Sequence, residues 1–91
     1  MMIKRAHVYF SGLVQGIFFR AFVRDEAKRL SLNGWVRNLE DGRVEAVFEG
    51  TEPTINTILE LCQTEHPRAR ISKIDITWEN PENLKGFKIL Y

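Results

Sequence analysis

A segment bracketed by two glycines, just ahead of a predicted helix, is the part of the sequence best suited to chemistry. Gly12 and Gly16 separate an apolar strand pattern from a helical pattern, and Arg20 follows in the first helical turn. Glycines permit backbone geometries closed to other residues, so such a loop can turn several N–H groups inward into a nest for an oxyanion. The following helix adds free N–H donors and the positive end of its dipole.

The charge of Arg20 also points toward an anion. A cation in the first turn of a helix is misplaced by about 0.3–1 kcal/mol, and the next carboxylate along the chain is Asp25. A guanidinium can grip two phosphate oxygens at once, so phosphate suits this place. On spacing alone a second interpretation stays open, namely a tight turn followed by a solvated arginine. The segment lacks the Gly-Lys-Ser/Thr and GxGxxG patterns of nucleotide-binding loops.

Apolar periodicity predicts the elements that position this loop. Alternation predicts a strand over His7–Ser11. From Phe19 an apolar stripe at helical spacing predicts a helix, which Asn33-Gly34 would end in a left-handed conformation. Further elements are predicted downstream: strands at Trp35–Leu39 and Arg43–Glu49 joined by an Asp41-Gly42 turn, a helix carrying Ile55, Ile58, Leu59 and Cys62, a strand carrying Ile74, Ile76 and Trp78, and a short last strand within Gly86–Tyr91.

The order β-α-β-β-α-β with an added terminal strand is the split βαβ pattern of ferredoxin-like folds. The predicted fold class is therefore α+β, a sandwich in which two helices cover one face of an antiparallel sheet, with a short C-terminal strand. Strands one and two run parallel in this topology, with a third strand between them. Their C-terminal ends and the start of the first helix then share one edge, where the Gly12–Gly16 loop, Arg20 and Asn38 should meet.

Length and composition limit what the chain can be. Ninety-one residues support one core, so we expect a single domain over residues 1–91, and an apolar fraction of 44% excludes disorder. Thirteen Lys+Arg against twelve Asp+Glu give +1, unlike the strongly basic face of a nucleic-acid binder. No apolar run approaches the roughly 20 residues of a membrane span, so we expect no membrane partner and a cytoplasmic location. With the single cysteine Cys62 and no cluster at metal-ligand spacing, we expect neither disulfide, metal nor other cofactor.

Two segments of the chain resemble the motifs of the acylphosphatase family. Gly12–Arg20 reads GLVQGIFFR, close to the family pattern G-x-V-Q-G-V-x-[FY]-R, and Gly34–Asn38 reads GWVRN, which matches the second motif G-W-V-x-N. The similarity covers essentially the whole chain, from the first strand to the Phe87–Tyr91 ending. There are two departures: Leu13 stands where many members carry a basic residue, and Ile17 replaces the commoner Val.

The resemblance implies an activity and roles for individual residues. Acylphosphatases hydrolyse the carboxyl–phosphate mixed anhydride to a carboxylate and inorganic phosphate, without a metal or a covalent intermediate. Carried over by motif, Arg20 would bind the phosphoryl oxygens and Asn38 would hold and orient the attacking water. The backbone N–H groups implied in phosphate binding are those of Gln15, Gly16, Ile17, Phe18, Phe19 and Arg20. The partner is then a small acyl phosphate, inorganic phosphate is product and competitive inhibitor, and a monomer is the expected state.

Two other functions are compatible with the element order. An RNA-binding βαββαβ module would need aromatic platforms on the third strand, where Arg43–Glu49 reads RVEAVFE. A non-catalytic acylphosphatase-like accessory domain would not require both Arg20 and Asn38, which are present here. Without the motif, Asn38 fits a residue that merely caps a strand-end turn.

The remaining reactive side chains favour structural roles. Cys62 completes an apolar helical stripe, which is typical of a buried inert thiol rather than a nucleophile. His7 alternates with core positions, which favours a structural place on the sheet face. His66 precedes a proline in a predicted loop and has no evident partner.

Overall fold

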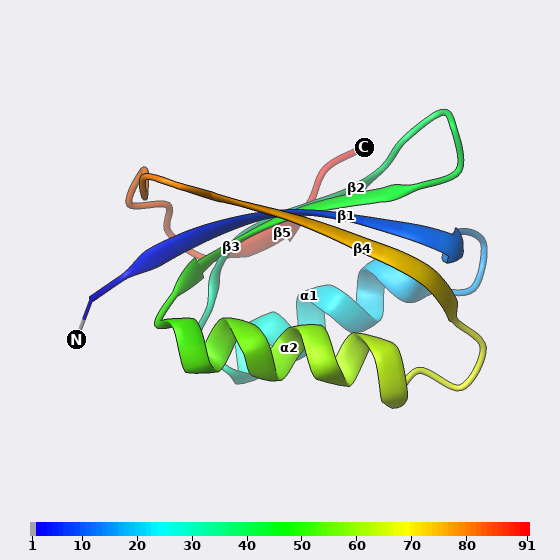
Figure 1. The fold of residues 1–91 in the computed structure, drawn as a ribbon, viewed down its shortest axis with the longest axis horizontal. Coiled ribbons are helices and arrows are strands. Elements are labelled where there is room, and N and C mark those ends of the chain that lie inside the picture. Colours follow the sequence, from blue (N-terminus) through cyan, green and yellow to red (C-terminus); the bar gives the residue numbers. More distant parts are fainter. Residues whose placement is uncertain (1) are drawn as a thin grey trace.

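A five-stranded sheet with two helices on one face makes up the computed structural model, which describes residues 2–91 (Figure 1). The predicted order β-α-β-β-α-β with a terminal strand is present. The elements in chain order are β1 (Lys4–Leu13), α1 (Phe19–Arg29), β2 (Asn33–Asn38), β3 (Val44–Gly50), α2 (Glu52–Thr64), β4 (Arg70–Glu79) and β5 (Phe87–Ile89).

The order of strands across the sheet is β4-β1-β3-β2-β5. Strand β3 pairs antiparallel with both β1 and β2, so β1 and β2 run parallel, as the topology predicts. One expectation needs correction, because β5 pairs with β2 in parallel, with Phe87 opposite Gly34. The sheet is therefore mixed rather than wholly antiparallel.

Both helices bury the apolar stripes that the sequence predicts. Helix α1 buries Phe19, Val23 and Ala27, and α2 buries Ile55, Ile58, Leu59 and Cys62. They pack on the sheet face formed by alternate residues of the central strands, among them Val8, Phe10, Val44, Ala46 and Phe48. Full burial of each large apolar side chain contributes about 1.5–3 kcal/mol. Burial also raises the pKa of the Cys62 thiol to about 12, which makes it the inert thiol expected.

The Asn33-Gly34 pair does not end the first helix. Helix α1 ends at Arg29, and the left-handed residue after it is Ser31, with φ 58°. Asn33 and Gly34 instead begin β2, where Gly34 has φ 143° and a Cβ added to it would lie 1.8 Å from the carbonyl oxygen of Val47. This glycine is required by close contact between strands, which no local pattern could indicate.

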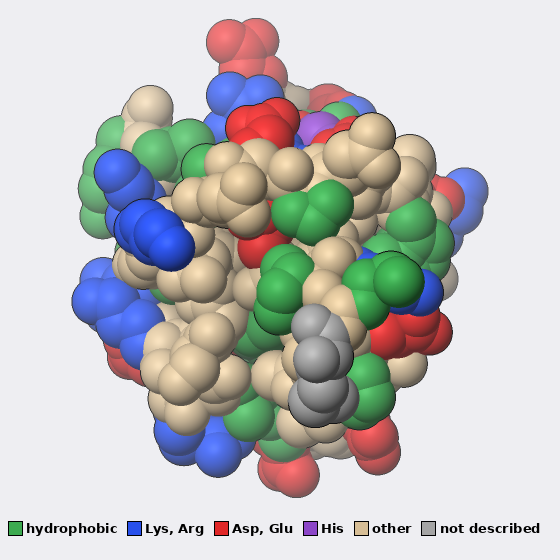
Figure 2. Space-filling model, turned by 90° about the vertical axis from the view of Figure 1, so that its left-hand side faces the viewer, with side chains coloured by type: hydrophobic (Ala, Val, Ile, Leu, Met, Phe, Trp, Pro, Cys, Tyr) green, Lys and Arg blue, Asp and Glu red, His purple; other side chains and the backbone are tan. Residues whose placement is uncertain are grey.

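The edge strand β4 leaves part of its apolar face uncovered. Ile76 lies opposite Val8 on the helix side of the sheet, yet it and Trp78 are 41% and 45% exposed. A shallow depression lined by Trp78 also includes Met2 and Ile3. Figure 2 shows this end of the molecule, with hydrophobic side chains spread over it and charged side chains around its margin. It lies opposite the end that carries the β1–α1 loop (Figure 1).

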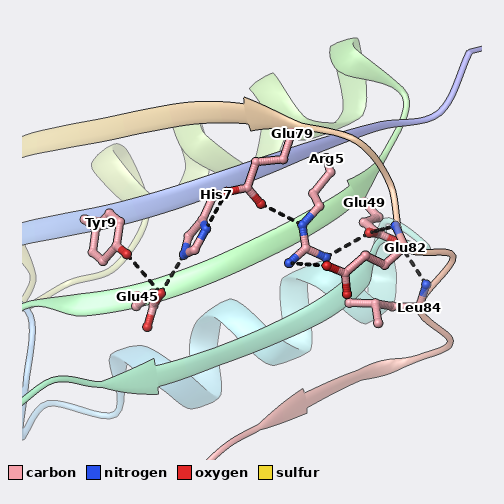
Figure 3. A network of polar contacts seen from close by, with 8 residues as sticks. All are labelled: Arg5, His7, Tyr9, Glu45, Glu49, Glu79, Glu82 and Leu84. Carbon is pink, nitrogen blue, oxygen red and sulfur yellow. Dashed lines mark hydrogen bonds and ion pairs between the residues drawn. The ribbon is translucent and has the colours of Figure 1, made fainter.

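The other face of the sheet is closed by charged side chains instead of helices (Figure 3). Glu45 and Glu49 of β3 lie on this face and are only 4% and 2% exposed. Arg5 donates from Nη1 to Glu49 Oε2 at 3.0 Å and from Nε to Glu79 Oε1 at 2.9 Å. The backbone N–H of Leu84 donates to the second oxygen of Glu49. Because its oxygens are satisfied in this way, the buried carboxylate Glu49 is tolerated.

His7 links two carboxylates in the same network. Its ring nitrogens lie 2.5 Å from Glu45 Oε2 and 2.9 Å from Glu79 Oε2. Burial alone would lower the pKa of His7, but the hydrogen bonds with Glu45 and Glu79 outweigh burial and hold that pKa above 6.5. The pKa values of Glu45 and Glu79 are lowered, against burial, chiefly through hydrogen bonds with His7, Arg37 and Arg5. Protonated His7 therefore stabilises the fold, which confirms its structural place on the sheet face.

Replacing His7 by Gln should weaken the dependence of stability on pH near neutrality. In the unchanged protein, the contribution of His7 is fully present below its unfolded-state pKa, near 6.5. It is lost as pH rises through the raised folded-state pKa. Urea unfolding from about pH 5 to about pH 9 measures this loss. Lys73→Gln, which removes an exposed cation of the same face, is the control and should keep the original slope. An unaltered slope in His7→Gln would contradict this role.

Candidate active site

The C-terminal ends of β1 and β2 meet the start of α1 at a depression of about 370 Å³. Of the predicted site residues, Gly16, Phe18, Phe19, Arg20 and Asn38 line it. The complete lining is Val14, Gly16, Phe18, Phe19, Arg20, Ala21, Arg24, Asn38, Ile89 and Tyr91. The predicted meeting of the loop, the arginine and the asparagine at one edge is therefore present.

The lining differs from the predicted set in both directions. Gln15 and Ile17 belong to the same loop but do not line the depression. The sequence does not predict the lining residues Val14, Ala21 and Arg24, which lie beside the motif residues, or Ile89 and Tyr91 at the C-terminal end of the chain. Ile89 and Tyr91 reach the site because β5 pairs in parallel with β2, and a three-residue strand carries too little pattern to reveal that pairing.

The backbone of the loop alternates in handedness ahead of the helix. Gly16 has φ 75° and Phe18 has φ 63°, whereas Ile17 between them keeps a negative φ. Such alternation directs successive N–H groups to one side, which is the geometry of an anion-binding nest. A left-handed conformation costs a non-glycine residue roughly 1–2 kcal/mol, so Phe18 holds a strained backbone at the edge of the site.

The start of α1 leaves backbone N–H donors without partners in the helix and places an arginine in a turn that has no acidic residue. The first helical hydrogen bond runs from the Phe22 N–H to the Phe18 carbonyl at 3.1 Å, and Phe18 supplies no side-chain cap. The N–H groups of the first turn therefore have no partner within the helix. No acidic residue stands in that turn, and the guanidinium of Arg20 lies 5.2 Å from the ring centre of Tyr91. Stacking on a ring leaves the edge N–H donors of an arginine available.

Asn38 is the last residue of β2 and lies on the helix side of the sheet, in register with Val44. Its Oδ1 is buried and has no hydrogen-bond partner among residues 2–91. The adjacent turn is closed by other groups, with the Leu39 N–H donating to the Arg43 carbonyl at 2.9 Å and the Arg43 N–H to Asp41 Oδ1 at 3.0 Å. A buried acceptor without a partner costs about 1–3 kcal/mol, so this arrangement speaks against a turn cap and for a group that donates to Asn38.

Gln15 ties the two halves of the site together. Its side-chain Nε2 donates to the carbonyl of Leu39 at 2.8 Å and to the carbonyl of Arg43 at 2.9 Å. These bonds hold the β1–α1 loop against the β2–β3 hairpin, beside Asn38. From the sequence, Gln15 is expected to contribute only its backbone N–H to phosphate binding. Nothing near it in the sequence indicates a side-chain partner more than twenty positions away.

His66 packs against the first turns of α1 and has hydrogen-bond partners, which corrects the expectation that it has no partner. Its Nδ1 accepts hydrogen bonds from the backbone N–H groups of Arg68 and Ala69, both at 3.1 Å. Its ring packs edge-on against Phe19 and Phe22, with centres 5.8 Å and 5.3 Å apart. The α2–β4 loop is thereby fixed to the first turn of α1.

The chemistry available at the depression is that of hydrogen-bond donation to an anion. Within residues 2–91 there is no group of three His, Cys, Asp or Glu side chains that could hold a metal ion. Over the same part of the chain, no helix is long and apolar enough to cross a membrane. Together, fold and site define the class of protein as a ferredoxin-like α/β sandwich with a cationic loop–helix site at one sheet edge.

Comparison with known proteins narrows this class to one family. The family model described as Acylphosphatase matches residues 6–89. The acylphosphatase of Haloquadratum walsbyi is 51% identical over 85 residues, covering 93% of this chain and 91% of the relative. The crystal structure of acylphosphatase from Bacillus subtilis matches with a TM-score of 0.92 and 35% identity, over 99% of this chain and 100% of that one. The chain belongs to the acylphosphatase family.

These matches confirm the predicted ferredoxin-like fold class and identify the activity as that of an acylphosphatase. The same fold also occurs inside a larger protein. Full-length HypF in its phosphate- and nucleotide-bound form matches with a TM-score of 0.89 and 26% identity, over 99% of this chain but only 12% of that one. The higher identity with the Haloquadratum enzyme, 51% against 26% with HypF, favours the enzyme over the accessory domain.

Replacing Gln15 by Ala should loosen the site as well as the fold. The change removes two hydrogen bonds to partly buried carbonyls, so the free energy of unfolding should fall by about 1–3 kcal/mol. Because a small misplacement of reacting groups can cost up to about 10²-fold in rate, kcat/KM for acetyl phosphate should fall by about tenfold or more. Gln63→Ala, at an exposed position of α2, is the control. A Gln15→Ala variant with original stability and rate would show that the bridge does not position the site.

Proposed function

We propose that this enzyme holds the phosphoryl group of an acyl phosphate with Arg20 and loop N–H groups, while Asn38 orients the attacking water. The observation that carries the proposal is the convergence of two groups in one depression. One is an arginine without an acidic residue in its helical turn, and the other is a buried asparagine oxygen to which no group of residues 2–91 donates. The first group favours an anion, and the second favours a hydrogen-bond donor such as water.

The phosphate half of the site depends on charge and on fixed donors. Arg20 supplies a planar fork for two phosphoryl oxygens. Alternating φ values in the loop and the unbonded first turn of α1 support a cradle of backbone N–H groups around the same oxygens. The N–H groups proposed are those of Gln15, Gly16, Ile17, Phe18, Phe19 and Arg20.

The water half of the site depends on Asn38. Its Oδ1 accepts one hydrogen of the water, which leaves a lone pair of the water oxygen free to attack phosphorus. The new P–O bond forms as the bond between phosphorus and the acyl oxygen breaks, and the acyl oxygen leaves with the electron pair as a carboxylate. An oxygen of the phosphoryl group takes the proton of the water. A carboxylate is a weak base, so no general acid is needed, and positioning with charge stabilisation is sufficient.

We extend the proposal to the oligomeric state, the cofactor requirement, the location and the inhibition of the enzyme. The proposed working form is a monomer with one domain over residues 1–91, in line with the single hydrophobic core that the sheet and both helices share. The reaction uses no metal or other cofactor, takes place in the cytoplasm, and is competitively inhibited by inorganic phosphate. The donors of the chain itself supply the charge stabilisation that a metal would otherwise provide.

Arg20→Ala should reduce hydrolysis of acetyl phosphate by about 10²–10³-fold or more, because the charge-assisted grip on the phosphoryl group is lost. Arg20→Lys should not restore the rate, since a point charge does not reproduce the planar fork. Phosphate release is measured in the presence of EDTA, with Arg68→Ala, at an exposed position, as the control. Full activity of Arg20→Lys would overturn the role of Arg20, and loss of activity on adding EDTA would overturn the metal-free reaction.

Asn38→Ala should lower kcat by about 10²–10³-fold and leave the inhibition constant of phosphate nearly unchanged. This pattern marks an interaction made mainly in the transition state. The free energy of unfolding should change by no more than about 1–2 kcal/mol. The kcat, the phosphate inhibition constant and the urea midpoint are measured on one preparation, with Asn56→Ala on the exposed side of α2 as the control. A variant that turned over normally but unfolded early would make Asn38 a turn residue only.

A further inference from the structure

A second arginine lines the depression and has no part in the mechanism above. Arg24 follows Arg20 by four positions along α1, so both side chains lie on one face of the helix, about one turn or roughly 5.4 Å apart. Two cations at this spacing repel each other, and Arg20 also stands near the positive end of the helix dipole. No Asp or Glu side chain lines the depression to offset them.

The surroundings of Arg24 leave most of its donors for a ligand. Its Nε donates to Oδ1 of the neighbouring Asp25 at 3.0 Å, and the two side chains are 36% and 67% exposed. Arg24 lines the depression and Asp25 does not, because consecutive residues of a helix point in different directions. Asp25 therefore contacts the Nε side of the guanidinium from outside the depression. The terminal amino groups of Arg24 take no part in that bond. Asp25 also offsets part of the positive charge of Arg24. The remaining charge suits a ligand group with one negative charge better than a dianion.

The depression is larger than a phosphoryl group requires. A volume of about 370 Å³ falls within the size range of sites for whole small molecules, roughly 300–1,000 Å³. Ile89 and Tyr91 add apolar surface to its wall, against which the carbon chain of a substrate can pack. With the phosphoryl group at Arg20, the acyl chain has room to extend toward Arg24.

We propose that Arg24 binds a carboxylate at the far end of the acyl chain, so that the enzyme prefers acyl phosphates derived from dicarboxylic acids. The planar guanidinium matches a carboxylate in geometry and charge. A spacer of two or three carbons between the anhydride and the second carboxylate is comparable in length to the helical turn that separates the two arginines. This inference rests on the proposed function, because Arg20 must hold the phosphoryl group at the same time.

The far carboxylate keeps its charge throughout the reaction, which determines where its effect appears. Its contact with Arg24 is equally strong in the bound substrate and in the transition state, so it changes KM and leaves kcat unaffected. Because Arg24 is partly exposed, dissolved salt screens the contact, and the preference weakens as ionic strength rises.

The test compares succinyl phosphate, which carries a second carboxylate, with butyryl phosphate, which has the same chain length and no second charge. For the unchanged enzyme, kcat/KM should favour succinyl phosphate by about three- to tenfold at low salt, in line with a partly exposed ion pair. Arg24→Gln should bring the ratio to about one, and Arg24→Glu should reverse it, with the change in KM. Arg29→Gln removes a cation from the far end of the same helix, where it pairs with Glu26, and should keep the original ratio.

Each result decides between the two levels of the proposal. Equal rates with both substrates in the unchanged enzyme, or a ratio that persists in Arg24→Gln, would overturn the role of Arg24 and leave the Arg20–Asn38 mechanism standing. If Arg29→Gln lost the preference for succinyl phosphate as fully as Arg24→Gln, the preference would come from the overall charge of the helix. That result would also overturn the role of Arg24. If the unchanged enzyme hydrolysed neither of these substrates nor acetyl phosphate, both the Arg20–Asn38 mechanism and the role of Arg24 would be overturned.

Discussion

The position of β3 at the centre of the sheet is the constraint on which the remaining structure depends. Because β3 pairs antiparallel with β1 on one side and β2 on the other, those two strands must run parallel and end at the same edge. Helix α1 crosses between them and begins at that edge (Figure 1). The same central place buries both faces of β3, including Glu45 and Glu49, so the neighbouring strand β1 must supply Arg5 and His7 to satisfy them (Figure 3).

The site concentrates unsatisfied groups where the rest of the molecule avoids them. The buried carboxylates of the open face find cationic and backbone donors, whereas Arg20 has no acid in its helical turn and Asn38 Oδ1 has no donor among residues 2–91. Phe18 adds a strained backbone at the same place. Such groups cost folding free energy, and they persist at functional sites because the surrounding structure over-determines them. In this enzyme that surrounding structure is the Gln15 bridge on one side and the ring of His66 on the other.

Local patterns in the sequence were sufficient for the elements and for part of the site. The stripes of α1 and α2 and the Asp41-Gly42 hairpin depend on spacing within a few residues, and the structure contains them. What the sequence could not provide depends on partners far along the chain. Gly34 is a strand residue because Val47 lies against it, β5 is parallel because of its pairing with β2, and Gln15 and His66 take their roles from backbone groups of other elements or turns. No sequence pattern marks Arg24 as a site residue, because an arginine in the second turn of a helix is common. Only the depression beside it indicates a role.

The Gln15 bridge joins two segments that the chain separates by an entire helix and strand. Any local opening of the β1–α1 loop away from the hairpin must break the same two hydrogen bonds, so the loop and the hairpin belong to one cooperative unit. Amide hydrogens in the two segments then exchange with solvent through a shared event rather than independently. At the level of such fluctuations the loop and the end of β2 that carries Asn38 open together rather than one at a time.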